Sequence, residues 1–427
     1  MGVNIKSQYR YYHERVTKTL AFIIPTHKKI LCYGNNCGRI LRSLRAANTA
    51  NPLGGKFDYI ILNGALGQSK DILGLIRNIR SACRSSTRII IYQYNYLWQG
   101  ILTLAEKLNL KRKEGVQNWL SVNDLNTYLE GAGLQVTRIF RRTVFPLDWF
   151  GLGRVLNFIG ALVPFFDFFK LDQFIIARPE SALFPRQLPE SLTICITVRN
   201  EKGNIEPIVR SLPRICRRQE ILFVEGHSTD GTRKEIIKVI KKYPAKNVRV
   251  MGQPGIGQGD ATRVGFKAAK GEIIIIYEGD GTSDPGDIAY FYQAMSSGRF
   301  EFIEGTRFVY PKDNRAMPLV NQLGNIFFAK WFSFFLGQRT NDVLSGIKSI
   351  LKRDFDLLYK RWGFLGFTDP FGDFELLYGA ARMGLKIGEI PIRYYPRTYG
   401  ETKTKPLTHG FYLFKMATKG YLIFRNN

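Results

Sequence analysis

Three short apolar runs in the second half of the chain constrain its fold more than any other feature. The runs are residues 191–198 (SLTICITV), 220–224 (EILFV) and 273–277 (IIIIY), and a turn and a helical pattern follow each of them. Continuous apolar runs of this length are typical of strands buried on both faces of a parallel sheet. The repeated order of strand, turn and helix therefore predicts an α/β fold in this half of the chain.

The acidic residues that could carry chemistry stand where these strands end. Glu201 follows the first run, Glu225 follows the second, and Glu278 and Asp280 follow the third. Because the carboxyl ends of parallel strands meet at one edge of a sheet, we expect these carboxylates to face one cleft. Glu278 and Asp280 are two residues apart and offer the hard oxygen ligands that Mg²⁺ or Mn²⁺ prefers. We expect them to hold such a metal; the alternative is a pair of solvated acids in a turn.

Six ordered motifs in this half resemble those of glycosyltransferase family 2, and most of all its dolichol-phosphate mannose synthase and polyprenyl-phosphate glycosyltransferase branch. They are TVRNEKGNI, FVEGHSTDGT, GIGQGDATRVGFKAAKGEIIIIYEGDGTSDPGDI, FIEGTRF, NDVLSGIKSI and FELLYGAARMGLKIGEIPIRYYPRTYGETK. The resemblance covers about residues 190–405. It implies a GT-A fold, which is a mostly parallel, Rossmann-like sheet flanked by helices.

The resemblance also implies a role for each matching position. The positions that would bind the nucleotide sugar donor are Glu201, Glu225, Gly257, Gly259, Asp260, Glu278 and Arg307. Those that would act in catalysis are Asp280, Asp342, Asp373, Glu375, Arg397 and Lys403, with Arg397 and Lys403 on a basic loop that closes on the diphosphate. The chain departs from the family where Glu225 and Glu278 replace the usual Asp, where Gly226-His227 replaces Asp-Gly, and where Gln258 replaces a basic residue.

The predicted reaction follows from the charges at such a site. Cleavage of the bond between the sugar and the nucleoside diphosphate leaves negative charge on the phosphate, which a metal at Asp280 and the two basic residues Arg397 and Lys403 would stabilise. A polyprenyl phosphate acceptor is largely dianionic at neutral pH and needs no general base. A glycan acceptor would need one, and Asp342, Asp373 and Glu375 are the candidates. Direct displacement predicts inversion at the anomeric carbon.

The first half predicts a second, smaller α/β domain. A strand at residues 29–33 ends in a glycine-bounded turn, strands follow at 56–63 and 87–92, and a final strand is expected at 134–140. About residues 10–145 resemble a class I S-adenosylmethionine-dependent methyltransferase. Only residues 39–55 separate this turn from the strand at 56–63, so the second strand of that family and its ribose-binding acid are expected to be deleted. We therefore expect a truncated, degenerate domain for which S-adenosylmethionine is an unlikely cofactor, with a bifunctional methyltransferase and glycosyltransferase as the alternative.

The expected domains are residues 1–178 and 191–427. The linker is residues 179–190, where PESALFPRQLP holds three prolines and no periodic pattern.

The net charge favours anionic partners. The chain has 62 Lys and Arg against 35 Asp and Glu, a formal charge of +27, and the excess is divided evenly between the two halves. It forms no basic arm, and no nucleic-acid-reading motif accompanies it. We therefore expect an anionic membrane surface and no nucleic acid, with a basic nucleic-acid-binding protein as the alternative from another class.

The localisation expected from the sequence is cytoplasmic, peripheral on the inner face of a membrane. The five cysteines are odd in number and form no CxxC pair, which favours reduced thiols. The N-terminus is polar, so no signal peptide is expected. The longest apolar run, residues 155–166, is too short to span a bilayer, which takes about 20 residues. Residues 321–337 predict either a buried helix or one that lies in a membrane surface.

Overall fold

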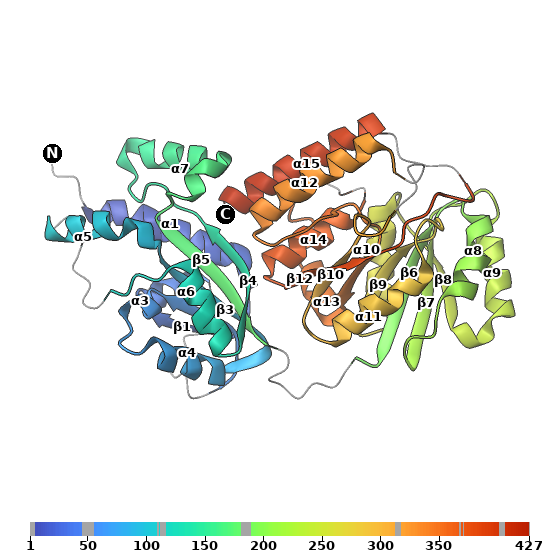
Figure 1. Ribbon diagram of the computed structural model, residues 1–427, viewed down its shortest axis with the longest axis horizontal. Helices are drawn as coiled ribbons and strands as arrows, with labels where there is room; N and C mark the ends of the chain where they lie inside the picture. Colours follow the sequence, from blue (N-terminus) through green and yellow to red (C-terminus); the bar gives the residue numbers. More distant parts are fainter. Residues whose placement is uncertain are drawn as a thin grey trace. The chain divides into compact units, whose positions relative to one another are not determined.

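The computed structural model describes residues 5–44, 55–108, 111, 117–180, 189–311, 317–366, 369, 371–400 and 406–426. The chain divides into two compact units. Unit 1 holds Met1–Pro185 with Arg382–Gly384 and Leu422–Asn427, and unit 2 holds Arg186–Ala381 and Leu385–Tyr421. Each unit is built on its own sheet (Figure 1). The linker expected at residues 179–190 lies mostly outside the described residues.

Unit 1 contains a five-stranded sheet in the order β1-β2-β3-β5-β4. The first three strands are parallel, whereas β5 runs antiparallel to both β3 and β4. The strands are β1 (Ile30–Gly34), β2 (Phe57–Asn63), β3 (Cys83–Tyr94), β4 (Leu134–Arg141) and β5 (Asp172–Pro179). The helices are α1 (Ile5–Ile23), α2 (Cys37–Ser43), α3 (Ala65–Gln68), α4 (Ile72–Ser81), α5 (Gln99–Lys107), α6 (Val122–Gly131) and α7 (Leu152–Leu162).

The sheet of unit 1 differs from the sequence prediction at β5. We expected the strand at residues 134–140 to be the last, but β5 follows it and pairs between β3 and β4. All eight residues of β5 are buried, yet its apolar run is short and is bounded by Gln173 and Arg178, which weakens the strand pattern. Between β1 and β2, the described residues form α2 and no strand.

Unit 2 contains a seven-stranded sheet in the order β12-β10-β11-β9-β6-β7-β8. Strands β8, β7, β6 and β9 are parallel, β11 is antiparallel to β9 and β10, and β10 is parallel to β12. The strands are β6 (Ser191–Val198), β7 (Arg218–Glu225), β8 (Val248–Gly252), β9 (Ile273–Glu278), β10 (Phe302–Thr306), β11 (Lys348–Leu351) and β12 (Ile387–Pro391). This confirms the predicted mostly parallel α/β fold of the GT-A type.

Helices cover the sheet of unit 2 on both faces (Figure 1). They are α8 (Lys202–Ser211), α9 (Thr232–Lys242), α10 (Gln258–Ala268), α11 (Ile288–Ser296), α12 (Leu319–Leu336), α13 (Lys352–Tyr359), α14 (Asp373–Arg382) and α15 (Pro406–Asn426). The core between the layers is mainly aliphatic, and Ile194, Ile275 and Phe223 are fully buried in it. Burial of this apolar surface is the main force that holds the layers together.

The register of the central strands aligns their carboxyl ends. Val198 of β6 lies opposite Glu225 of β7, and Thr197 of β6 lies opposite Glu278 of β9. The turns that follow these strands therefore open at one edge of the sheet, as predicted for parallel strands.

Helix α12, which covers residues 321–337 except the last, is buried on one side and exposed on the other. One side of it is buried, at Asn325, Ala329 and Phe332, and the other exposes Leu323 and Phe327. Helix α15 lies beside it in Figure 1, and the Trp331 ring lies 5.8 Å from that of Phe414 and 5.9 Å from that of Tyr421. Among the described helices, none is long and apolar enough to cross a membrane.

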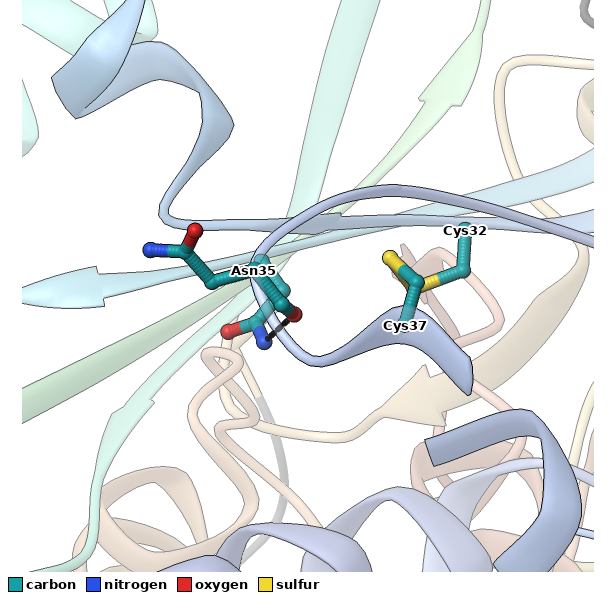
Figure 2. Close-up of a disulfide and its surroundings, with 4 residues drawn as sticks. Cys32, Asn35 and Cys37 are labelled. Atoms are coloured by element: carbon teal, nitrogen blue, oxygen red, sulfur yellow. Dashed lines mark hydrogen bonds between the residues drawn. A yellow bond between two sulfur atoms is a disulfide. The ribbon is translucent and has the colours of Figure 1, made fainter. Parts of the chain in front are cut away.

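A disulfide joins Cys32 and Cys37 in unit 1 (Figure 2). The cysteine pattern favoured reduced thiols, so this bond corrects that prediction. The reason is the turn between β1 and α2, which folds back with Gly34 at φ +106° and Asn36 at φ +54°. It brings the two Cα atoms to 5.5 Å, within disulfide range. Cys83, Cys195 and Cys216 are free thiols.

Candidate active site

Arg397 connects two carboxylates at the edge of the sheet where β6 and β9 end. Its Nη1 donates to Glu201 Oε1 and its Nη2 donates to Asp280 Oδ2, each at 2.8 Å. The other oxygen of Glu201 accepts from Asn204, and the other oxygen of Asp280 accepts from the backbone N and the hydroxyl of Thr282. Glu201, Asp280 and Arg397 were predicted as site residues from three separate motifs, and they meet here.

Glu278 lies two residues before Asp280, at the end of β9. Burial and the charge of Asp280 raise the pKa of Glu278 to about 7. Gln258 donates a hydrogen bond of 2.8 Å to Glu278 Oε1, so the residue that replaces a basic side chain of the family contacts this carboxyl group. Gly346 leaves space for it, because a Cβ at that position would lie 2.0 Å from Glu278 Cδ.

The glycine-rich loop before α10 is shaped by two different requirements. Gly257, which precedes α10, has φ +93°, which disfavours other residues. Gly259, in the first turn of α10, lies so close to Asp369 that a Cβ there would be 2.1 Å from its carbonyl oxygen. Asp260 accepts from the backbone N of Gly255 at 2.7 Å and pairs with Arg263 at 2.5 Å. Asp260, in the first turn of α10, therefore holds the preceding loop in place.

The turn after β7 contains one departure from the family, His227. His227 has φ +57°, a left-handed conformation, at the position where the family usually has Gly. Its Nε2 lies 3.1 Å from the Gly255 carbonyl oxygen. Glu225 accepts from the backbone N of Ser228 at 2.5 Å and lies 3.8 Å from Arg233. The turn is thus closed by its own carboxylate.

Arg307 and Asp342 form a buried ion pair. The guanidinium donates from Nε at 2.7 Å and from Nη2 at 2.8 Å, and Asn325 of α12 donates to the same carboxylate at 2.8 Å. Although burial opposes ionisation, Arg307 keeps the pKa of Asp342 below its usual range. Such an ionised, paired carboxylate is a weak general base, so Asp342 is better suited to positioning Arg307.

Asp373 and Glu375, the two predicted site residues on α14, contact different partners. Asp373 pairs with buried Lys348 at 3.0 Å, and Lys348 also lies 3.8 Å from Glu304. Burial raises the pKa of Asp373, with Lys348 opposing the shift. Glu375 is buried too, but it accepts a hydrogen bond from the backbone N of Gly363, on another side of the helix because residues two apart differ by about 200°.

One predicted residue, Lys403, lies outside the described residues, so the basic loop is represented here by Arg397 alone. Three further residues shape the site without having been predicted. Lys348 and Asn325 bind Asp373 and Asp342, and Asp369 accepts from the backbone N of Phe374 at the start of α14. Only Lys348 left a signal in the sequence, as a single charge within an apolar strand.

The carboxylates fit a divalent ion of the kind that the sequence predicts. Asp280 and Glu278 are half-buried side chains with hard oxygen donors, and Mg²⁺ typically takes one or two such ligands and completes its shell with phosphate oxygens and water. No cluster of three or more His, Cys, Asp or Glu that could hold a metal occurs among the described residues.

Unit 1 has a hollow of its own beside the disulfide. It has a volume of about 360 Å³ and is lined by residues of β1, α3 and α4 and the turn before α4. Its one acidic residue, Asp71, caps α4 by accepting from the backbone N of Gly74 at 2.8 Å. This carboxylate is therefore engaged in capping a helix.

Comparison with known proteins defines the class of unit 2. Residues 193–357 match the family model described as glycosyl transferase family 2. The chain therefore contains a domain that matches this family over residues 193–357, and it is a nucleotide-sugar-dependent glycosyltransferase, as the six motifs predicted.

Archaeal enzymes are among the similar curated proteins. Glycosyltransferase AglJ of Haloferax volcanii is 28% identical over 53% of this chain and 70% of its own length. The dolichyl-phosphate hexose transferase of the same organism is 28% identical over 54% of this chain and 93% of its own length. A UDP-N-acetylglucosamine–dolichyl-phosphate N-acetylglucosaminyltransferase of Methanococcus voltae is 26% identical over 52% of this chain and 92% of its own length.

Among solved structures, glucosyl-3-phosphoglycerate synthase of Mycobacterium tuberculosis aligns with 54% of this chain and 78% of its own, at 16% identity and a TM-score of 0.40. The fold assignment rests on the strand order of unit 2.

Proposed function

We propose that this protein transfers a sugar from a nucleoside diphosphate sugar to a polyprenyl phosphate, with inversion at the anomeric carbon. The observation that carries the proposal is the Arg397 guanidinium held between Glu201 and Asp280. At this place two carboxylates, which could bind the donor and its metal, lie beside a cation that could bind the diphosphate of the donor. The names of the archaeal relatives, two of which include dolichyl phosphate, support the acceptor class.

The donor would bind across the ends of β6, β7 and β9. Glu201 and Glu225 would contact the nucleoside, and the braced glycine loop would lie over it. Asp280, with Glu278 beside it, would hold Mg²⁺ or Mn²⁺, which when bound offsets negative charge on the diphosphate. Arg397 would stabilise the same charge as the sugar leaves, and Lys403 would join it from the same loop.

The acceptor would enter from the side of Arg307. This residue is held in place by Asp342 on one side, and its guanidinium carbon lies 5.2 Å from the centre of the Tyr394 ring. A phosphate monoester dianion is nucleophilic without a base, which agrees with the low pKa of Asp342 and the ion pairing of Asp373. The acceptor phosphate would thus attack the anomeric carbon directly, and one displacement gives inversion.

A lipid acceptor also agrees with the exposed side of α12 and α15. Leu319, Val320 and Leu323 on α12 and Phe411 and Phe414 on α15 are each at least half exposed. Apolar side chains on two adjacent helices are suited to a membrane surface, from which a polyprenyl chain could be presented. We propose a peripheral site of action at a membrane surface.

Mass spectrometry of the products formed from a panel of nucleotide sugars with a polyprenyl phosphate tests the proposal. We expect a sugar-phospho-polyprenol that partitions into organic solvent, and its formation should require Mg²⁺ or Mn²⁺. Asp280→Ala should reduce the rate at least about a hundredfold while the fold is retained. Sugar found only in a water-soluble glycan would overturn the acceptor class, and full activity of Asp280→Ala would overturn the metal assignment.

A further inference from the structure

Helix α7 of unit 1 packs inward with small side chains. Its buried residues are Gly153, Asn157, Gly160 and Ala161. A Cβ at Gly153 would lie 1.8 Å from the carbonyl oxygen of Leu147, and one at Gly160 would lie 2.3 Å from Cγ2 of Val144. The small residues therefore allow α7 to lie directly on the segment that follows β4.

Asn157 fixes the orientation of α7 on this segment. Its Oδ1 accepts from the backbone N of Val144 at 2.7 Å and of Phe145 at 3.1 Å. Its Nδ2 donates to the Phe145 carbonyl at 2.7 Å and to the Tyr11 hydroxyl at 3.2 Å. A buried amide with four hydrogen bonds is costly to remove, so the helix is held with this side inward.

The opposite side of α7 exposes large apolar residues. Leu152, Val155, Phe158, Ile159 and Leu162 are each between 39% and 54% exposed. A helix on the surface of a water-soluble domain normally shows the reverse pattern, with its large apolar side chains facing the core. The orientation of α7 is therefore one that suits an apolar environment outside the protein.

The segments on both sides of α7 continue this surface. Phe150 in η3 (Trp149–Gly151) is fully exposed at φ +45°, and Phe165 in η4 (Pro164–Asp167) is 69% exposed. Between Trp149 and Phe169 eleven large apolar side chains are exposed, and the two charged residues are Arg154 and Asp167. We call residues 149–169 the α7 surface.

The two charges of the α7 surface are compensated. Arg154 pairs with Asp148 at 2.9 Å, and Asp167 pairs with Lys170 and with Arg425 at 2.5 Å each. The surface also extends to η2 (Tyr96–Trp98), because Trp98 Nε1 donates to the Phe169 carbonyl at 2.8 Å.

A lipid bilayer matches this surface best. Eleven large apolar side chains are exposed within the 21 residues of the α7 surface, and monomeric soluble proteins rarely expose large apolar patches. Aromatic residues concentrate at membrane interfaces, and residues 1–190 hold 26 Lys and Arg against 12 Asp and Glu, which favours anionic headgroups. Helix α7 has 11 residues, about half of what a span needs, so it would lie in the plane of the interface.

We propose that unit 1 docks on an anionic phospholipid bilayer by inserting the α7 surface into its interfacial layer. This surface lies outside the glycosyltransferase domain and goes beyond the proposed reaction. It gives unit 1 a membrane-binding role that needs neither S-adenosylmethionine nor the donor site.

Vesicle flotation of the full chain tests the proposal, with vesicles of phosphatidylcholine and phosphatidylglycerol. The test variant is Val155→Ser/Phe158→Ser/Phe165→Ser, and the matched control is Leu73→Ser/Ile237→Ser/Tyr290→Ser, which changes three exposed apolar residues elsewhere. We expect the test variant to bind vesicles about tenfold more weakly or worse, since each side chain loses apolar contact with lipid. The control should bind like the unchanged protein.

Transfer to a polyprenyl phosphate in detergent separates this proposal from the proposed function. The test variant should keep that activity, because its three residues are outside the donor site. Equal vesicle binding by the test variant and the unchanged protein would overturn the membrane role of the α7 surface. So would a dimer that the test variant disrupts in the absence of any vesicle binding, since the surface would then bind a second copy.

Discussion

At the scale of single residues, unit 2 works through charges that are held in pairs. Arg397 bridges Glu201 and Asp280, Arg307 is fixed by Asp342, and Lys348 lies between Asp373 and Glu304. A buried ion pair contributes little net stability, but loss of one partner leaves an uncompensated charge. These pairs therefore set the position and ionisation of the groups that a donor would meet.

Arg397→Lys should lower kcat/KM by about tenfold or more. A lysine ammonium is a point charge and cannot span two carboxylates as the planar guanidinium does. Steady-state kinetics with the nucleotide sugar measures the effect. Arg218→Lys, at an exposed ion pair with Glu190, is the control and should leave the kinetics unchanged. Equal kinetics for both variants would contradict the bridging role of Arg397.

Glu304→Gln should alter how stability depends on pH. Burial, opposed by Lys348, raises the pKa of Glu304 to about 8. Because the folded state holds this proton more tightly than the unfolded state, the native protein loses stability as the pH rises from about 4.5 to 8. The glutamine variant does not lose stability in this way. Its free energy of unfolding relative to the native protein should therefore rise by about 1.4 kcal/mol for each unit of pKa shift.

Denaturant unfolding of both proteins across this pH range measures the difference. Glu235→Gln in α9 serves as the control for the loss of one carboxylate. A stability difference between Glu304→Gln and the native protein that stays constant with pH would contradict the raised pKa.

At the scale of elements, strand register and close backbone approaches build the donor site. Strands β7 and β9 flank β6, so the turns after all three open at one edge of the sheet. The start of α10 also lies against the backbone of Asp369. Only a glycine at position 259 leaves room for this close approach.

Gly259→Ala should displace the glycine loop, since its Cβ would lie 2.1 Å from the Asp369 carbonyl oxygen. We expect a KM for the nucleotide sugar that is about tenfold higher, by analogy with other changes that overpack a rigid site at a cost of about 1–3 kcal/mol. Gly324→Ala in α12, where a Cβ meets no atom within 4 Å, is the matched control. It should be neutral or stabilise by up to about 1 kcal/mol. Unchanged donor kinetics in Gly259→Ala would show that the loop does not cover the nucleotide.

At the scale of the whole molecule, two units with separate sheets share one chain. One carries the motifs of the reaction, and the other carries the disulfide and the α7 surface. Each unit has its own hydrophobic core, so we expect their unfolding to be separable.

Reduction of the Cys32–Cys37 disulfide should destabilise unit 1 alone. A loop this short implies a loss of roughly 2 kcal/mol in the free energy of unfolding, because the reduced unfolded chain gains freedom. Calorimetry with and without reductant should show one transition that shifts down and one that does not. Cys32→Ser/Cys37→Ser should behave like the reduced protein. An equal shift of both transitions would contradict independent units.

The sequence by itself determined the α/β class, strands β6, β7 and β9 of unit 2, and the edge of the sheet where Glu201, Glu225, Glu278 and Asp280 gather. It could do so because apolar runs and the turns after them are local, and parallel strands impose a common direction. It did not reveal β5, whose central place depends on pairing with two strands distant in sequence.

Only the tertiary structure decided how the site residues are paired. Arg397 reaches Glu201 across 196 positions of sequence, and Lys348 and Asn325 find their carboxylates through packing that no local pattern encodes. The tertiary structure also decided the pairing of Cys32 with Cys37 and which side of α7 is exposed. A side chain's type is a local property of the chain, whereas its burial and its partner depend on what the fold brings against it.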